Sequence, residues 1–180
     1  LFYVTNRLDY PAAYKDSCKT GVVEMNVILR GDRSLSVVNS LDFSNMGMDF
    51  QWEATRMVKR SAALWTPARH QDKPVTTSFP LRAVFKSDAA GCKAANELFD
   101  RALLLSDEAT RLVQEKKNEE AIAKWSEAIR LQPSNTELLY YRGTTLINNG
   151  RREEGCEDYT KIHALLGVTW FEPIRKIMCP

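Results

Sequence analysis

The chain has 180 residues, 44 % hydrophobic and 27 % charged, a composition typical of a globular protein with one medium domain or two small ones. Its formal net charge of +2 and pI near 8.4, without a clustered basic stretch, argue against a nucleic-acid partner. No apolar run approaches the ~18 residues of a membrane-spanning segment. The abrupt start at Leu1, without Met, signal peptide or lipidation motif, predicts a processed chain or part of a longer one.

The N-terminal third is predicted to begin with a short helix and a β-hairpin. Residues 1–4 fit either a short strand or the end of a linker. Pro11 suits a first helical turn and predicts a helix over residues 11–16. Alternating apolar residues then predict strands over 22–30 and 35–43, which the turn residues between them would join.

An amphipathic helix is predicted next. Apolar residues recur at helical spacing between about residues 49 and 63, with basic residues between them. Asp49 is the predicted N-cap, and the segment Trp65–Pro67 is expected to end the helix.

The following strand, residues 74–86, has the clearest alternation in the chain. One face carries the residues expected to point to the core: Val75, Thr77, Phe79, Leu81, Ala83 and Phe85. Pro80 lies on the opposite, mostly polar side. Because proline cannot donate a ladder hydrogen bond, this strand is expected at a sheet edge with the Pro80 nitrogen facing outward. Such an edge is either protected or used to dock another chain.

The order and spacing of several short motifs over residues 9–87 resemble the TonB C-terminal domain. The motifs are Tyr10-Pro11-x-Ala13, Gly21-Val22-Val23, Trp65-x-Pro67-Ala68, Lys73-Pro74-Val75 and Phe79-Pro80-Leu81-x-x-x-Phe85. At two positions where that family commonly has glycine, this chain has other residues, near Arg33 and at Asp72. These departures affect the local geometry of two turns. The resemblance implies a small three-stranded antiparallel sheet with helices on one face.

The resemblance also implies a periplasmic domain that binds an extended peptide of an outer-membrane transporter along its last strand. In this chain the residues expected to direct backbone groups to such a peptide by β-augmentation are Thr76, Ser78, Arg82 and Val84. The inner-membrane helix and proline-rich spacer of that family's energy transducers are not in this sequence, so it supports binding rather than force transduction.

The C-terminal half contains an internal repeat of 34 residues. The offset aligns small residues with small ones and large residues with large ones: Leu105 with Leu139, Ala109 with Gly143, Leu112 with Leu146, Ala121 with Gly155 and Trp125 with Tyr159. The pattern resembles tetratricopeptide (TPR) repeats over residues 102–135 and 136–169. The first copy lacks the usual turn glycine, at Lys116, and the usual aromatic, at Asn118.

Two repeats seldom bury enough surface alone, so both ends are expected to be covered. A capping helix over 88–101, begun by Ser87-Asp88, and a C-terminal tail over 170–180 would do this, for five long helices plus a short tail. The resemblance implies a peptide groove lined by Thr110, Val113, Gln114, Tyr140, Thr144, Ile147 and Asn148. Tyr140 and Thr144 replace the residues that clamp a terminal carboxylate in chaperone-type members.

Nothing in the sequence predicts an enzyme or a cofactor. The two histidines, His70 and His163, are isolated, and no nucleophile motif, phosphate loop or acid pair accompanies them. The four cysteines lack zinc-ligand spacing. The TonB-like topology would bring Cys18 near Cys92, so we hypothesise a disulfide that ties the sheet to the helical part; buried free thiols are the alternative. Cys156 is expected to be a buried thiol.

The sequence therefore predicts an α+β protein: a TonB-like domain over residues 1–87, followed by an all-α TPR-like array over 88–180. The predicted function is a periplasmic protein–protein interaction module associated with outer-membrane transport or assembly machinery. Two alternatives stay open: a permanent structural subunit of an outer-membrane-associated complex, and the C-terminal part of a TonB-type energy transducer.

Overall fold

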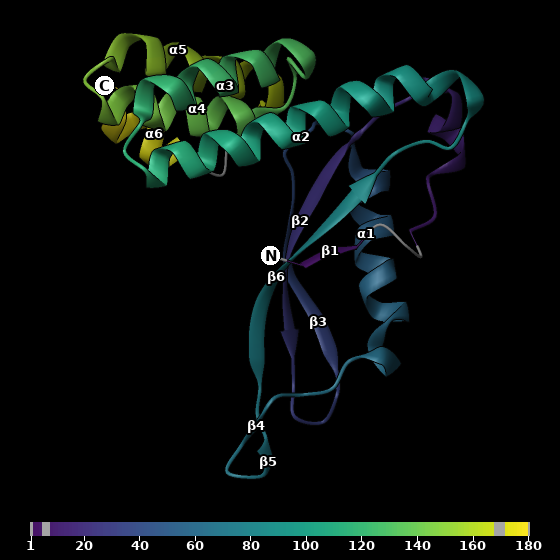
Figure 1. The fold of residues 1–180 in the computed structure, drawn as a ribbon. Helices are drawn as coiled ribbons and strands as arrows, with labels where there is room; N and C mark the ends of the chain where they lie inside the picture. The colour runs from purple at the N-terminus through teal and green to yellow at the C-terminus, as the bar shows by residue number, and fades with distance from the viewer. Residues whose placement is uncertain (1, 5–7, 168–171, 180) are drawn as a thin grey trace. The chain divides into compact units, whose positions relative to one another are not determined.

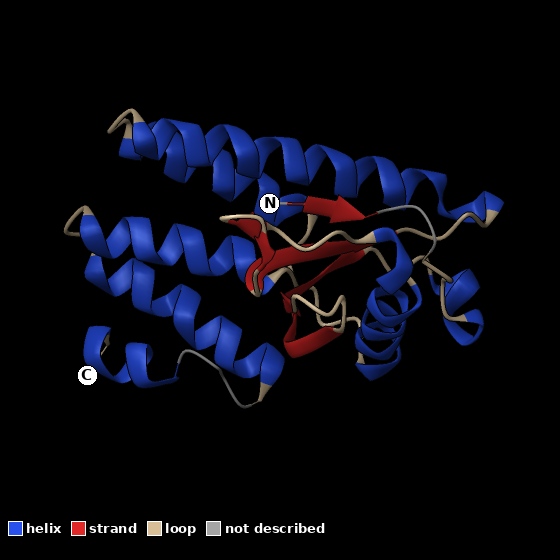
Figure 2. Ribbon diagram, turned by 90° about the horizontal axis from the view of Figure 1, so that it is seen from below, coloured by secondary structure: helices blue, strands red, loops and turns tan. Residues whose placement is uncertain are grey.

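The computed structural model describes residues 2–4, 8–167 and 172–179, and it forms two compact units, Leu1–Lys93 and Ala94–Pro180 (Figure 1). The first unit is built on a β-sheet and the second consists of helices (Figure 2). This is the α+β architecture that the sequence predicts.

The sheet of the first unit is organised around β2 (Gly21–Leu29). It pairs antiparallel with β3 (Leu35–Asp42) on one side and with β6 (Thr77–Phe85) on the other. A fourth strand, β1 (Phe2–Val4), adds to β6 in parallel, so the order is β1-β6-β2-β3. The strands β4 (Arg69–His70) and β5 (Lys73–Pro74) form a separate small ladder. The predicted strand 74–86 is thus divided between β5 and β6.

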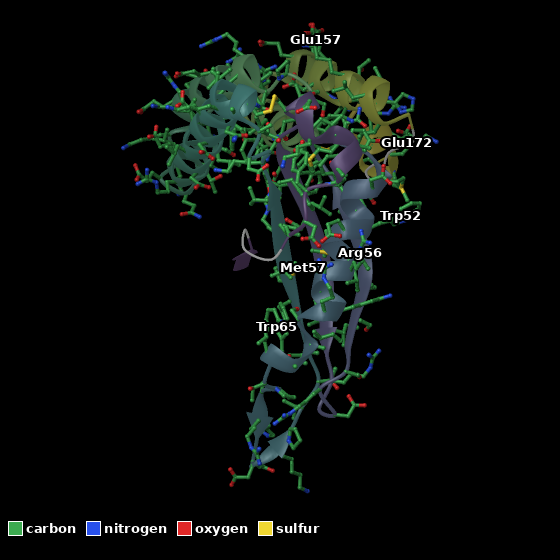
Figure 3. All side chains as sticks on the ribbon, turned by 90° about the vertical axis from the view of Figure 1, so that its right-hand side faces the viewer. Trp52, Arg56, Met57, Trp65, Glu157 and Glu172 are labelled. Carbon is green, nitrogen blue, oxygen red and sulfur yellow. A yellow bond between two sulfur atoms is a disulfide. The ribbon has the colours of Figure 1, made fainter. Side chains whose placement is uncertain are left out.

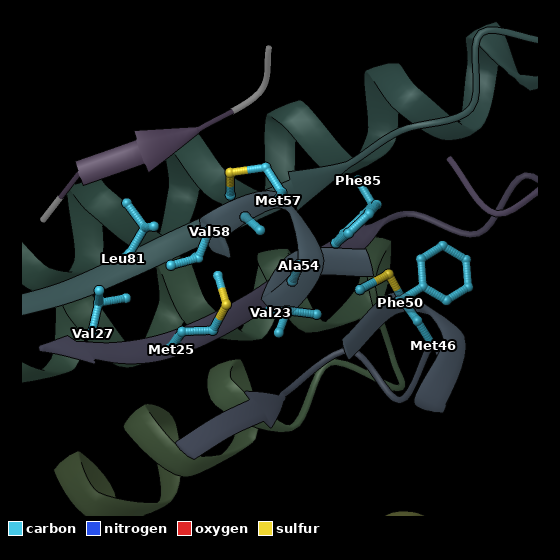
Figure 4. Close-up of a cluster of buried hydrophobic side chains, with 11 residues drawn as sticks. Val23, Met25, Val27, Met46, Phe50, Ala54, Met57, Val58, Leu81 and Phe85 are labelled. Carbon is cyan, nitrogen blue, oxygen red and sulfur yellow. The ribbon is translucent and has the colours of Figure 1, made fainter. Parts of the chain in front are cut away.

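One face of this sheet packs against α1 (Met48–Arg60). Helical spacing places Phe50, Ala54, Met57 and Val58 on the buried side of α1, as predicted. They meet the side chains that alternation places on the inner face of β2 and β6 (Figure 4). Phe50 contacts Phe85 edge-to-face, with ring centroids 5.2 Å apart.

The ends of α1 differ from the prediction. Its N-cap is Gly47 rather than Asp49, which lies within the first turn, where its charge suits the helix dipole. The helix ends at Arg60, and a short 3-10 helix, Ala62–Leu64, precedes Trp65. The predicted helix 11–16 is a 3-10 helix, Ala12–Ser17.

The second unit contains α2 (Lys93–Gln114), α3 (Asn118–Leu131), α4 (Thr136–Asn148), α5 (Arg152–Leu166) and the short α6 (Glu172–Met178). The prediction of five long helices is wrong. The expected capping helix and the first repeat helix are one continuous α2, because no glycine or proline interrupts residues 93–114. Residues 168–171 and 180 of the predicted tail lie outside the described residues.

Small residues set the helix spacing in both repeats. Ala109 and Ala121 are fully buried between α2 and α3. At the equivalent positions of the second repeat, Gly143 and Gly155 bring α4 and α5 so close that a Cβ at Gly155 would lie 2.5 Å from the Gly143 carbonyl oxygen. The 34-residue alignment therefore pairs residues with the same structural role.

Both repeats also end their first helix with the same hydrogen-bonded turn. Lys117 N donates to Leu112 O and Lys116 N to Val113 O; Arg151 N donates to Leu146 O and Gly150 N to Ile147 O. This Schellman pattern requires a left-handed residue after the helix. In the second repeat that residue is Gly150, with φ +83°, and in the first it is Lys116, with φ +62°.

We predict that Lys116→Gly stabilises the helical unit by about 1 kcal/mol, because a lysine backbone is disfavoured in the left-handed region and glycine is not. Urea unfolding followed by circular dichroism measures the change. The matched control is Gly150→Lys, which should destabilise by a similar amount. Destabilisation by Lys116→Gly, or no destabilisation by Gly150→Lys, would contradict the turn's role.

Candidate functional site

The outer edge of β6 is the candidate site in the first unit. Asn26 of β2 is paired with Pro80, and the Asn26 N–H points to the other side, where it donates to Asn39 Oδ1 of β3 at 3.2 Å. In an antiparallel ladder, a residue whose N–H faces one neighbour does not bond to the other. Pro80 therefore costs the β2–β6 ladder nothing, and its nitrogen faces the outer edge, as predicted.

The same alternation applies along the rest of β6. Residues an even number of positions from Pro80, namely Ser78, Arg82 and Val84, also face the outer edge with their backbone groups. Thr76 lies one residue before β6 and is not part of the ladder. Ser78 is exposed, while Arg82 and Val84 are buried. Arg82 Nε lies 3.4 Å from Glu24 Oε2 on the neighbouring strand.

This edge is not open along its whole length. The strand β1 lies beside β6 in parallel, with Phe2 opposite Leu81, Tyr3 opposite Arg82 and Val4 opposite Ala83 (Figure 4). The expectation that this strand lies at a sheet edge is therefore wrong over these three residues, which β1 covers. Aromatic and β-branched residues favour strands, but three residues carry too little periodicity to fix a partner from sequence.

The predicted groove residues of the second unit separate into two groups. Thr110 and Gln114 on α2 and Asn148 on α4 are exposed, as a binding surface requires. Tyr140 and Thr144 instead turn towards the second helix of their own repeat. Tyr140 stacks on Tyr159 with ring centroids 6.0 Å apart, and Thr144 Oγ1 lies 2.8 Å from the Tyr159 hydroxyl. Burial raises the pKa of Tyr159, which keeps its hydroxyl neutral in this contact.

A buried ion pair joins the helices of the second repeat, and the sequence reasoning missed it. The Arg142 guanidinium donates to both carboxylate oxygens of Asp158, at 2.8 and 2.6 Å, and to Ser126 Oγ at 3.0 Å. The Asp158 side chain is 1 % exposed. Arg142 on α4 thus holds α5 and α3 together. The sequence feature that could have indicated this pair is an arginine sixteen residues before an aspartate, one on each helix of a predicted hairpin.

We predict that Asp158→Asn destabilises the helical unit by about 3–5 kcal/mol, because it leaves a partly buried guanidinium without its charge partner. The control is Glu154→Gln, which removes the exposed Arg151–Glu154 pair and should cost under about 1 kcal/mol. Urea unfolding by circular dichroism separates them. Similar small changes for both variants would exclude a stabilising role for the Arg142–Asp158 pair.

The structure contains the hypothesised disulfide between Cys18 and Cys92, with a Cα–Cα distance of 5.0 Å. Both cysteines belong to the first unit, so the bond does not tie the sheet to the helical unit. It fastens the segment after β6 to the 3-10 helix Ala12–Ser17. Two contacts support the same junction: Ser87 Oγ donates to Lys15 O at 2.6 Å, and Lys15 Nζ lies 3.2 Å from Asp88.

The expectation that Cys156 is a free thiol is wrong, because it forms a disulfide with Cys179. The C-terminal helix α6 brings Cys179 back to α5, a return that the sequence did not predict. Met178 and Cys179 pack beside the cluster of Leu139, Tyr159 and Ile162, and Arg152 Nε donates to Met178 O at 2.7 Å. The end of the chain therefore covers the second repeat.

The two disulfides should stabilise their units to different extents. Loop-closure entropy gives about 4 kcal/mol for the separation of 74 residues and about 3 kcal/mol for that of 23. The double variants Cys18→Ser/Cys92→Ser and Cys156→Ser/Cys179→Ser should lose these amounts, each in its own unit. Urea titration read by hydrogen-exchange mass spectrometry resolves the units. Loss of protection in the wrong unit would contradict this assignment.

No cluster of metal-ligating side chains forms within residues 2–4, 8–167 and 172–179. No group of three His, Cys, Asp or Glu side chains in that part of the chain is placed to hold a metal ion. His70 is exposed in β4, and His163 Nδ1 lies 3.5 Å from Glu172. Glu172 belongs to α6 and is labelled in Figure 3. Among these residues, no helix has the length and apolar character needed to cross a bilayer.

Comparison with known protein families identifies a TPR repeat. The family model for this repeat matches residues 110–150, which run from the C-terminal part of α2 through α3 and α4. No curated protein matches the chain. The match agrees with the paired helices and the small-residue contacts described above. TPR repeats are scaffolds for protein–protein interaction, so the second unit is a scaffold of this kind.

Proposed function

We propose that the protein is a periplasmic interaction module in which the first unit binds an extended segment of a partner by β-augmentation and the TPR-like unit is a scaffold. One observation carries the proposal: the outer edge of β6 takes an added parallel strand at Leu81–Ala83. An edge that pairs with one extended segment has the geometry to pair with another.

The turns of the first unit support its TonB-like character. Arg33 and Asp72, the positions where that family commonly has glycine, both adopt left-handed conformations, with φ of +69° and +60°. Non-glycine residues rarely adopt this conformation, so the backbone follows a path that suits glycine despite the substitutions. The departures from the motif therefore leave the turns themselves intact.

The disulfides support the proposed compartment. All four cysteines are paired within the two units, and such bonds persist in oxidising compartments such as the bacterial periplasm. With the TonB-like fold, this suggests partners in outer-membrane transport or assembly machinery. We propose a binding role without catalysis, because the exposed candidate residues are backbone edges and polar helix faces rather than convergent reactive groups.

The proposal is tested by removing one outward N–H from β6. Because Arg82 has the same orientation as Pro80, Arg82→Pro should keep the β2 ladder and lose one donor at the outer edge. Affinity capture from solubilised Gram-negative membranes, with identification by mass spectrometry, should recover an outer-membrane transporter or assembly component. We expect roughly tenfold less capture by Arg82→Pro, equivalent to about one hydrogen bond.

Arg82→Val serves as the matched variant, because it removes the same side chain and keeps the N–H. Any decrease in capture by Arg82→Val measures the contribution of the Arg82 side chain to binding, including its contact with Glu24. Circular dichroism and intact mass with both disulfides establish folding of each variant. The proposal fails if no outer-membrane component is captured, or if Arg82→Pro captures as much as Arg82→Val.

A second candidate is a permanent structural subunit. The pairing of β1 with β6 favours it, since an edge that is already covered can serve to protect the sheet rather than to exchange peptides. In that case the captured complex would survive dilution without exchange, and the Arg82→Pro variant would fail to assemble.

A further inference from the structure

We propose that β1 is a resident strand that a partner displaces, and that the partner pairs with Leu81–Ala83 in parallel, in the register that β1 now occupies. This inference rests on the proposed function of the β6 edge. It adds that β1 occupies the β6 edge in the isolated chain, and it specifies the kind of peptide that displaces β1.

The two sides of β6 are paired very unequally. Towards β2, all nine residues from Thr77 to Phe85 have a partner. Towards β1, the ladder covers three residues of the part of the chain that the structure describes, Phe2–Val4. A three-residue parallel ladder is a weak association, because each residue adds little and parallel pairing is slightly less stable than antiparallel pairing. An incoming segment that covers more of the same edge would therefore compete well.

The next described residues after β1, Leu8 and Asp9, are held by the first unit, so β1 can leave without disturbing the core of that unit. Leu8 packs against the core cluster, and the Asp9 N–H donates to Glu53 Oε1 at 3.1 Å. The Asp9 carboxylate also lies 3.0 Å from Arg60. Glu53 comes from α1 and its side chain is 2 % exposed. Release of residues 2–4 thus ends at Leu8 and Asp9, which are held by the core cluster and by the buried Glu53.

The register defines the chemistry of the partner. In a parallel pair, opposite residues project to the same face. Residues of the partner opposite Leu81 and Ala83 would join the apolar face, and the residue between them would lie beside the Glu24–Arg82 pair. The partner is therefore an extended peptide with two apolar residues separated by one residue. The sequence of β1 has this form, with Phe2 and Val4 at the two apolar positions.

Pro80 limits the direction in which the partner can extend. A parallel strand running ahead of the Leu81 position meets Pro80, which has no N–H to donate. Beyond Ala83 the edge continues with Val84, whose backbone groups face outward. We therefore expect affinity to rise when residues are added after the second apolar position, and to stay nearly constant when they are added before the first.

The test supplies β1 in trans. A peptide of residues 1–8 with an N-terminal fluorophore is titrated by fluorescence anisotropy onto the full chain and onto Val4→Pro, which removes an N–H from β1. We expect Val4→Pro to bind the peptide at least about tenfold more tightly than the wild type, because its own strand no longer competes. Val4→Ile keeps the N–H and strand propensity, and it should bind as the wild type does.

A measurement on the wild type keeps the test decisive if Val4→Pro folds poorly. With saturating labelled peptide, hydrogen-exchange mass spectrometry should show faster exchange in residues 2–4 of the protein and unchanged protection in β2. Equal peptide affinity of wild type and Val4→Pro, or unchanged exchange of residues 2–4, would overturn the displacement model. Capture of a membrane partner that depends on Arg82 would still support the β6 edge, so the two proposals fail separately.

Discussion

The antiparallel ladder between β2 and β6 is the constraint on which the first unit depends. It fixes which side chains of β6 enter the core and which backbone groups face away from β2. Leu81, Ala83 and Phe85 pack under α1 because of this register, and a slip of one residue would move them to the other face. The same register turns Pro80 and Arg82 to the outer edge, so the core and the candidate site have one origin.

Each unit is small, and each carries one disulfide that closes its own chain. About ninety residues bury a limited apolar core, so a covalent link adds a substantial share of the stability. Cys18–Cys92 holds the segment that leaves β6, and Cys156–Cys179 holds α6 over the last repeat. Each bond thus fastens the C-terminal end of its unit to an earlier part of the same unit.

The secondary structure and repeats could be predicted from the sequence because they depend on local spacing. The buried residues of both units follow from patterns in the sequence. These patterns are the strand alternation, the helical period of α1 and the 34-residue repeat. The length of α2 and the N-cap of α1 could not be predicted in this way, because several residues near each helix boundary have similar preferences for starting or ending a helix. Four of the seven predicted groove residues are exposed, namely Thr110, Val113, Gln114 and Asn148, whereas Tyr140 and Thr144 contact Tyr159. Helix spacing alone does not distinguish these neighbouring faces.

The sequence alone determined the orientation of Pro80 and the fold class, because a missing N–H and a hydrophobic period are properties of the residues themselves. Only the tertiary structure decided what lies beside Pro80's strand. The pairing of Phe2–Val4 with Leu81–Ala83 joins segments almost eighty residues apart, as does the bond between Cys18 and Cys92. Such contacts depend on where the whole chain brings its ends, and no local pattern in three residues or one cysteine encodes that.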